Sequence, residues 1–160
     1  MVESVLEPVE AEPPSSAVPD EAACETLLEG ATAISHTCGC AHAVVIGHHT
    51  LPYVLALLHQ GCASVRSARP DCPAPDCEAA ELAWIVDLDG RTELVDALRA
   101  ARSRVGRRGR VVLEGAAFRW RTGLAALPKV ALEAGLDVIA VDSKMRRVVL
   151  APAIPLALAA

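Results

Sequence analysis

The residues best suited to chemistry are concentrated between positions 34 and 49, where the sequence reads ISHTCGCAHAVVIGHH. The first half of this stretch alternates metal-binding side chains in the pattern H-x-C-x-C-x-H, made by His36, Cys38, Cys40 and His42. Cysteine and histidine are preferred ligands of zinc in tetrahedral sites, so a zinc site is one interpretation. On a β-strand these side chains share a face but lie about 6.6 Å apart, too far for one ion unless Gly39 bends the chain. The alternative interpretation makes the cysteines small hydrophobic core residues.

The second half of the stretch predicts a ligand-binding crevice. The apolar, β-branched run 41–47 is typical of a buried parallel strand, and it leads into a loop made by Gly47, His48, His49 and Thr50. Open α/β sheets bind ligands outside the carboxyl ends of their strands. Three acids lie at the ends of later apolar runs and are the candidate catalytic residues: Asp87, Asp89 and Glu114. Two simpler roles stay open, a solvated polar loop for the histidines and helix capping for Asp89.

Strand-like and helix-like segments alternate along the chain. Strands are predicted at 41–47, 62–68, 81–88 and 110–115, and helices at 21–34, 50–61, 91–105 and 123–135. Asp89 or Thr92 can cap the helix at 91–105, and GRRGR (106–110) is predicted to be a turn. The last segment predicts a hairpin around 142–144, which adds one antiparallel edge strand. This order predicts an α/β fold, a Rossmann-like, mainly parallel sheet with helices on both faces and a C-terminal antiparallel β-hairpin.

The N-terminal residues differ in composition from the remainder of the chain. Residues 1–29 carry eight acids and no base, and residues 1–19 are proline-rich with few large apolar side chains. We therefore expect a disordered tail at 1–19 and a single domain at 20–160. The tail has no signal-peptide pattern, and no apolar run reaches the roughly 18–20 residues of a membrane helix. We expect a cytoplasmic protein whose six cysteines stay reduced.

Nine arginines lie between residues 91 and 121, against a net charge of −5 for the whole chain. Six of them follow the helix and the turn predicted there: Arg99, Arg102, Arg104, Arg107, Arg108 and Arg110. Three interpretations are open for this run, namely a solvated helix face, a phosphate-binding patch and an internal dock for the acidic tail. An acidic chain with few aromatic rings argues against nucleic acid. We expect instead a protein partner or a second copy of the chain.

Three segments resemble the class I S-adenosylmethionine-dependent methyltransferases. ALRAARSRVGRRGRVVLEG (97–115) is similar to the family's helix, basic glycine turn and strand, and LPKVALEAGLDVIAVDSKMRRVVLAPA (127–153) to its last helix and terminal hairpin. AHAVVIGHH (41–49) stands in the place of the first strand and its glycine-rich loop. The resemblance covers about residues 41–152. It implies a cofactor at the loop Gly47–Thr50 and substrate-contacting or catalytic residues at the end of the strand that precedes Asp87 and Asp89.

The chain departs from the family pattern at the cofactor site. The family's loop is GxGxG-like, whereas Gly47 is the only glycine of the loop here. The place of the family's ribose-binding acid falls near Arg69, and the proline-rich loop 69–80 replaces a helix, a strand and a helix that wall the adenine. We therefore predict weak or no binding of S-adenosylmethionine. Three functions follow as hypotheses: a degenerate, shortened methyltransferase-like domain acting as a non-catalytic interaction or regulatory module, an active methyltransferase on an unknown acceptor, and a metal-binding protein.

Overall fold

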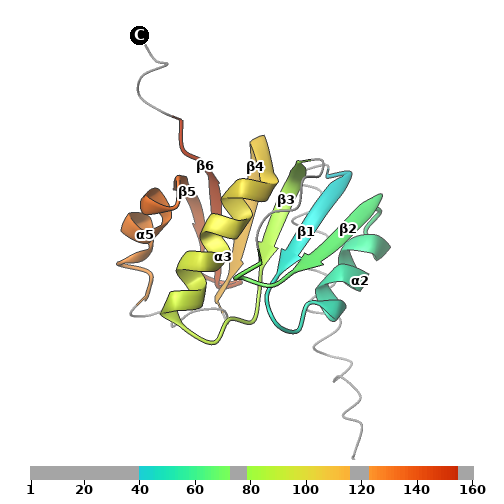
Figure 1. Cartoon of the computed structure of the whole chain (residues 1–160), viewed down its shortest axis with the longest axis horizontal. Coiled ribbons are helices and arrows are strands. Elements are labelled where there is room, and N and C mark those ends of the chain that lie inside the picture. Colours follow the sequence, from blue (N-terminus) through green and yellow to red (C-terminus); the bar gives the residue numbers. More distant parts are fainter. Residues whose placement is uncertain (1–39, 73–78, 116–122, 155–160) are drawn as a thin grey trace, which may run out of the picture.

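The computed structural model of the chain describes residues 40–72, 79–115 and 123–154 (Figure 1). Its strands are β1 (His42–Ile46), β2 (Ser64–Ala68), β3 (Ala80–Ile85), β4 (Val105–Glu114), β5 (Leu136–Asp142) and β6 (Arg147–Pro152). Its helices are α2 (Leu51–His59), α3 (Arg91–Arg104) and α5 (Leu127–Glu133). The predicted tail at 1–19, the predicted helix at 21–34, and His36 and Cys38 lie outside the described residues.

The six strands form one sheet in the order β2-β1-β3-β4-β6-β5. The first four strands of the chain pair in parallel, and β6 runs antiparallel to both of its neighbours. The predicted Rossmann-like sheet with a C-terminal hairpin is therefore confirmed. The antiparallel strand is not at the edge, because β6 inserts between β4 and β5. The apolar content explains this order: Val148 and Leu150 of β6 are fully buried, whereas Ile139 and Val141 of β5 are exposed.

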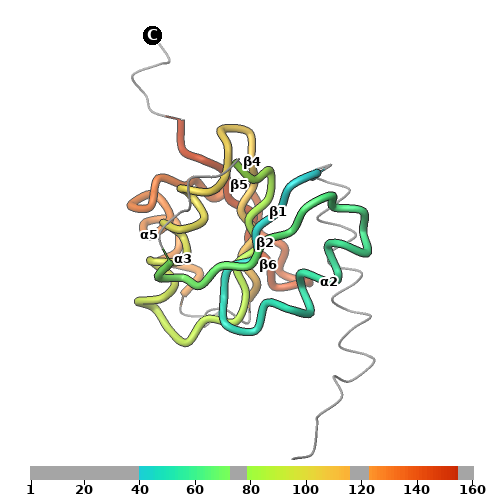
Figure 2. The backbone as a smooth tube through the Cα atoms, turned by 45° about the vertical axis from the view of Figure 1, so that its right-hand side comes forward, coloured from blue at the N-terminus to red at the C-terminus, as the bar shows by residue number. Residues whose placement is uncertain are grey.

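Helices cover both faces of the sheet, as predicted. Figure 2 shows α3 and α5 on one side of the strands and α2 on the other. Alternate residues of β1 separate accordingly: Val44 and Ile46 pack in the core beneath α3 and α5, and Ala43 and Val45 in the core beneath α2. No helix among the described residues is long and apolar enough to cross a membrane.

The segment GRRGR is part of β4 and not the predicted turn. Helix α3 ends at Arg104, and Val105 already pairs with Ala80 of β3. The next pair along the two strands joins Leu82 to Arg110, so the register shifts and the extra residues of β4 form an irregular, bulged stretch. A run of glycine and arginine suggests a turn, but it also suits a bulge.

The predicted capping of α3 is wrong. Its N-cap residue is Gly90, with no capping bond from a side chain, so neither Asp89 nor Thr92 caps the helix. The solvated-face interpretation fits Arg99, Arg107 and Arg108, which are exposed. It does not fit Arg104, which is 7% exposed and whose guanidinium donates to the carbonyls of Ala100 and Cys72. The buried Arg104 side chain thus satisfies one carbonyl of its own helix and one carbonyl of the segment that follows β2.

Candidate functional site

The candidate site begins where β1 ends, at a glycine that the sheet requires. Gly47 has a φ of +155°, and its N–H donates to the carbonyl of Ala68, 3.1 Å away, at the end of β2. A Cβ at this position would lie 1.9 Å from the carbonyl oxygen of Val86, which follows β3. Only glycine allows so close an approach of two backbones. The loop after β1 is thus held against both neighbouring strands.

His48 forms an ion pair with the first turn of α3. Its Nε2 atom lies 2.9 and 3.0 Å from the two carboxylate oxygens of Glu93 and 3.6 Å from Oδ2 of Asp89. The hydrogen bond to Glu93 raises the pKa of His48 above its ordinary value. The pKa of Glu93 is lowered, first by the backbone N–H of Asp89, which donates to Oε2 at 2.7 Å, and then by His48. Both shifts favour the charged forms.

His49 pairs with Asp87 across the same crevice. The backbone N–H of His49 donates to Oδ2 of Asp87 at 3.2 Å, and ring Nδ1 of the histidine contacts the same oxygen. Asp87 has a φ of +46°, in the left-handed region, which aspartate tolerates better than most residues. Thr50 follows as the N-cap residue of α2 and makes no side-chain capping bond. Two histidine–carboxylate pairs therefore bridge the loop after β1 to the chain that follows β3.

Glu114, the third predicted catalytic residue, lies in a separate cluster beneath α2. Its Oε1 accepts hydrogen bonds from Nε1 of Trp84 at 3.0 Å and from Nε of Arg147 at 2.7 Å. Burial raises the pKa of Glu114 although the Arg147 guanidinium opposes the shift. Tyr53 of α2 stands edge-on to Trp84, with ring centroids 5.0 Å apart, and burial raises its pKa as well. The catalytic roles assigned to Asp87, Asp89 and Glu114 stay predictions.

Arg69 takes the place that the family pattern gives to an acid. It is exposed and follows directly on Ala68, the last residue of β2. The carbonyl of Ala68 accepts the N–H of Gly47, so Arg69 stands beside the predicted cofactor loop. β2 pairs only with β1 among the described strands and is therefore an edge strand. The cofactor-binding roles of Arg69 and of the loop Gly47–Thr50 stay predictions.

The described part of the predicted zinc cluster is not arranged around one point. Cys40 precedes β1 and packs in the core beneath α2, where its Sγ atom lies 3.1 Å from that of Cys62. His42 begins β1 and, by strand alternation, points to the opposite face from Ala43. Ligand atoms of three other residues, which the sequence interpretation did not group, lie within 4.8 Å of one another: His48, Asp89 and Glu93. Imidazole and carboxylate are suitable donors for zinc and manganese.

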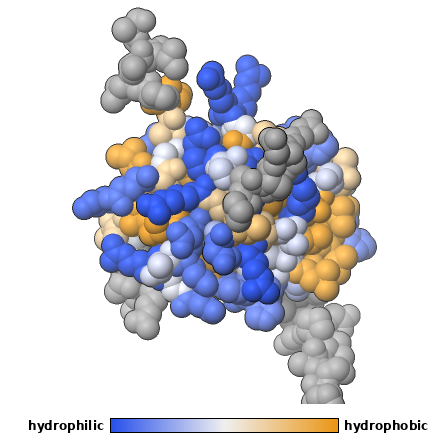
Figure 3. Space-filling view, in the orientation of Figure 1, coloured by the Kyte–Doolittle hydropathy of each residue, from blue (hydrophilic) through white to orange (hydrophobic). Residues whose placement is uncertain are grey.

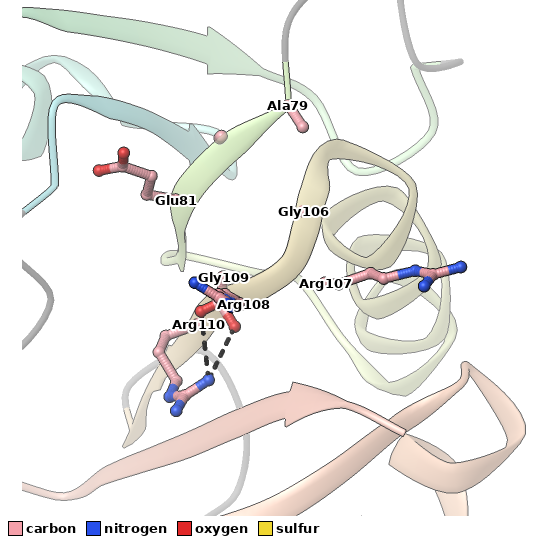
Figure 4. A pocket seen from close by; sticks show the side chains of 8 residues that line it. Ala79, Glu81, Gly106, Arg107, Arg108, Gly109 and Arg110 are labelled. Atoms are coloured by element: carbon pink, nitrogen blue, oxygen red, sulfur yellow. Dashed lines mark hydrogen bonds between the residues drawn. The ribbon is translucent and has the colours of Figure 1, made fainter. Parts of the chain in front are cut away.

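A hollow of about 500 Å³ lies at the opposite end of the sheet, at the amino ends of β3 and β4. It includes three residues of the arginine run, Arg107, Arg108 and Arg110. Figure 4 shows Arg107 and Arg110 pointing away from one another, and Arg110 donates to the carbonyls of Arg108 and Gly109 in its own strand. These side chains do not converge on one point, so the arrangement gives no support to the phosphate-binding interpretation.

Three residues of the two clusters were not found by sequence reasoning: Glu93, Tyr53 and Arg147. An acid in the first turn of a helix, four positions after Asp89, was a detectable signal for Glu93. Arg147 meets Glu114 because these residues are paired in the register of β4 and β6. Nothing in the local sequence around either residue indicates that pairing.

Comparison with known proteins identifies the fold. The sequence matches no protein-family profile and no curated protein. Solved structures similar to this chain include the ribosomal protein L11 methylase of Lactobacillus delbrueckii subsp. bulgaricus, with a TM-score of 0.62, 10% identity and coverage of 84% of this chain and 81% of that one. The sugar N-methyltransferase KedS8 of Streptoalloteichus sp ATCC 53650 has a TM-score of 0.57 and 9% identity, covering 96% and 98% of the two chains.

A third similar structure, the CcbJ methyltransferase of Streptomyces caelestis, has a TM-score of 0.56 at 13% identity and covers 80% of this chain and 90% of its own. The glycopeptide N-methyltransferase MtfA, with a TM-score of 0.58 and 9% identity, was solved in complex with sinefungin, covering 80% of this chain and 94% of its own. At these identities the likeness concerns the backbone arrangement. The chain has the fold of the class I S-adenosylmethionine-dependent methyltransferases.

Proposed function

We propose that this chain is a cytoplasmic, non-catalytic member of the methyltransferase fold, acts as a protein-interaction module, and binds S-adenosylmethionine weakly or not at all. One observation carries the proposal: the crevice at the carboxyl ends of β1 and β3 is bridged by the chain's own side chains. His48 pairs with Glu93, and His49 pairs with Asp87. A cofactor seated there has to displace both pairs before it makes any contact of its own.

Arg69 and the edge position of β2 also weaken the proposed binding of S-adenosylmethionine. Arg69 offers hydrogen-bond donors where the resembling family offers an acceptor to the ribose hydroxyls, and β2 is an edge strand with no further described strand to wall the adenine. A buried polar group left without its partner costs about 1–3 kcal/mol. Each 1.4 kcal/mol lowers affinity tenfold, so two such losses, about 2–6 kcal/mol, amount to roughly one and a half to four powers of ten.

Calorimetric titration of the full chain with S-adenosylmethionine and S-adenosylhomocysteine at pH 7.5 tests the proposal. We expect no dissociation constant tighter than about 100 μM, because the losses above remove that much affinity from a micromolar site. A triple variant, His48→Ala with His49→Ala and Arg69→Asp, removes both pairs and restores the acceptor. It should bind at least tenfold more tightly than the natural chain. Low-micromolar binding by the natural chain, or no gain in the variant, contradicts the proposal.

The interaction surface that we propose is the outer face of α2. Leu51, Leu55 and Leu58 are 67%, 48% and 43% exposed, and their spacing puts them on one stripe of the helix. Figure 3 shows the corresponding apolar area where α2 lies in Figure 1. The helix has no acid, lysine or arginine, so the same stripe on a second copy can meet it across a two-fold axis without charge repulsion. We infer a homodimer through α2.

Light scattering after size-exclusion chromatography, repeated at several concentrations, tests the dimer. The natural chain should elute as a dimer, and Leu55→Glu should elute as a monomer because it places a charge in the apolar contact. Leu132→Glu is the matched control, since Leu132 is 61% exposed on α5, away from this stripe. A monomeric natural chain, or a dimer that Leu132→Glu disrupts and Leu55→Glu does not, overturns the assignment.

A second candidate function is divalent-cation binding, favoured by the three ligand atoms of His48, Asp89 and Glu93 within 4.8 Å of one another. Titration with zinc chloride distinguishes this cluster from the one predicted in the N-terminal part of the sequence. Zinc binding that His48→Ala abolishes and Cys38→Ser preserves supports the crevice as the site. The reverse pattern supports the cysteine-containing cluster.

A further inference from the structure

A pair of buried thiols lies beneath α2, at the opposite end of β1 from the histidine loop. The Sγ atoms of Cys40 and Cys62 are 3.1 Å apart, and each residue is 5% exposed. Cys40 precedes the first strand, and Cys62 follows the turn that ends α2. We propose that these two residues are an oxidisable dithiol, which a disulfide-type oxidant such as oxidised glutathione converts into a disulfide.

The pairing of β1 with β2 brings the two residues near each other, just before the two strands begin. β1 and β2 are parallel neighbours with His42 opposite Ser64, and the carbonyl of Ala41 accepts the N–H of Ser64 at 3.0 Å. Cys40 and Cys62 each lie two residues before these partners, outside the bounds of the two strands. Neighbouring strands lie about 4.8 Å apart, within the roughly 4.4–6.8 Å between Cα atoms that disulfides span. The bond therefore closes by a sulfur movement of about 1 Å, to a length of about 2.05 Å.

The oxidation balances as two thiol–disulfide exchanges. One cysteine loses its proton, and its thiolate attacks a sulfur of oxidised glutathione, which breaks that S–S bond and releases one glutathione thiolate. The second cysteine then loses its proton and attacks the mixed disulfide, releasing the second glutathione. Two cysteine thiols are oxidised to one disulfide, and one oxidised glutathione is reduced to two thiols. Because both sulfurs are buried, the first attack requires a local opening, so we expect the pair to react more slowly than the exposed Cys72.

The disulfide would link the two ends of the segment that contains the histidine loop and the proposed dimer helix α2. The two cysteines are 22 positions apart, and the loop contains β1, the histidine loop and α2. The N–H of Cys62 already donates to the carbonyl of Leu57, so the link would tie the end of α2 to the beginning of β1. A cross-link restricts the unfolded chain and should raise the Tm by about 10 °C. Oxidation would thereby raise the stability of the folded domain.

The test uses the full chain, first reduced and then incubated with oxidised glutathione. Peptide mapping without reduction should recover a Cys40–Cys62 linked fragment about 2 Da lighter than the sum of its two reduced peptides, and dithiothreitol should reverse it. The oxidised protein should unfold about 10 °C higher in a thermal melt. A variant with the other four cysteines replaced by serine should behave in the same way. Cys62→Ala, the matched control, should show no such shift.

Two results overturn the inference. The first is a map in which either cysteine is linked mainly to another residue, such as Cys38. The second is retention of both thiols after prolonged incubation with oxidised glutathione, continued long after Cys72 is fully oxidised. Mapping of the natural chain keeps the inference testable even where the serine variant fails to fold.

Discussion

Replacing Gly47 with alanine tests whether this glycine is required by the sheet and not by a ligand. An added Cβ would lie 1.9 Å from the carbonyl oxygen of Val86, and real Cβ atoms essentially never come closer than 3.0 Å to such an atom. The obstacle is backbone, so no side chain can rotate out of the way. Either the loop after β1 or the end of β3 must move by roughly 1 Å, in an interior packed as densely as a crystal.

The loss of stability expected for Gly47→Ala follows from the surroundings of Gly47. Overpacking of this kind costs about 1–3 kcal/mol, and a positive φ in a residue with a Cβ adds about 1 kcal/mol. Three backbone hydrogen bonds hold the same region: Gly47 to Ala68 at 3.1 Å, Val86 to Ile46 at 2.9 Å and His48 to Asp87 at 3.3 Å. Weakening one of them costs about 1 kcal/mol. The sum is about 3–5 kcal/mol, out of a total stability of about 5–15 kcal/mol for a domain.

Urea unfolding followed by tryptophan fluorescence measures this loss, since Trp84 is fully buried. With a slope of about 2 kcal/mol per molar, the midpoint for Gly47→Ala should fall by roughly 1.5–2.5 M. Gly90→Ala is the matched control, because a Cβ there would have no heavy atom within 4 Å, and it should stay within about 1 kcal/mol of the natural chain. A loss below 1 kcal/mol for Gly47→Ala would refute the reasoning and leave the glycine available for a ligand role.

The ion pairs of His48 and Arg147 and the hydrogen bonds of Arg104 give three further measurable outcomes. The pKa of His48 is raised, so its pair with Glu93 stabilises the fold fully below pH 6.5, and this stability is lost as pH rises through the raised pKa. The pKa of Glu93 is lowered, so its stabilising contribution is present above pH 4.5 and is lost as pH falls through the lowered pKa. Proton NMR should therefore give His48 a midpoint above 6.5, and Glu93→Gln should move it back toward 6.5. Arg147→Ala leaves Glu114 buried without its cation and should cost about 3–5 kcal/mol in urea unfolding; a loss below 1 kcal/mol contradicts the buried pair. Arg104→Ala removes two hydrogen bonds to carbonyl groups and should cost about 1–3 kcal/mol in the same assay.

The fold could be predicted from the sequence because its core strands are short apolar runs between turn residues. HAVVI in β1 is an example: its valines and isoleucine leave little choice but a buried strand. The beginning of β4 could not be predicted, since VGRRGR has the composition of a turn and stays in the sheet only by pairing with Ala80 of β3. The place of β6 inside the sheet also depends on a pairing between strands distant along the chain.

The candidate site was predictable in part for the same reason. The carboxyl ends of adjacent parallel strands meet at one edge, so His48 and His49 were expected near Asp87 and Asp89. Which histidine pairs with which carboxylate depends on loop conformation, including the positive φ of Asp87. Glu114 was expected to line the same crevice, but its partner Arg147 comes from a different part of the chain and engages it beneath α2.

The agreement with the family pattern and the departures from it differ in physical origin. Gly47 follows the pattern, and the closeness of the Val86 carbonyl accounts for it without any ligand. His48, His49 and Arg69 depart from the pattern, and all three are exposed, so the apolar core does not require these residue types. The sheet thus requires the glycine that follows the family pattern, whereas the exposed positions of the cofactor site have other side chains than the family. This division is the one that we expect under the proposed function, in which the domain keeps the fold and binds S-adenosylmethionine weakly or not at all.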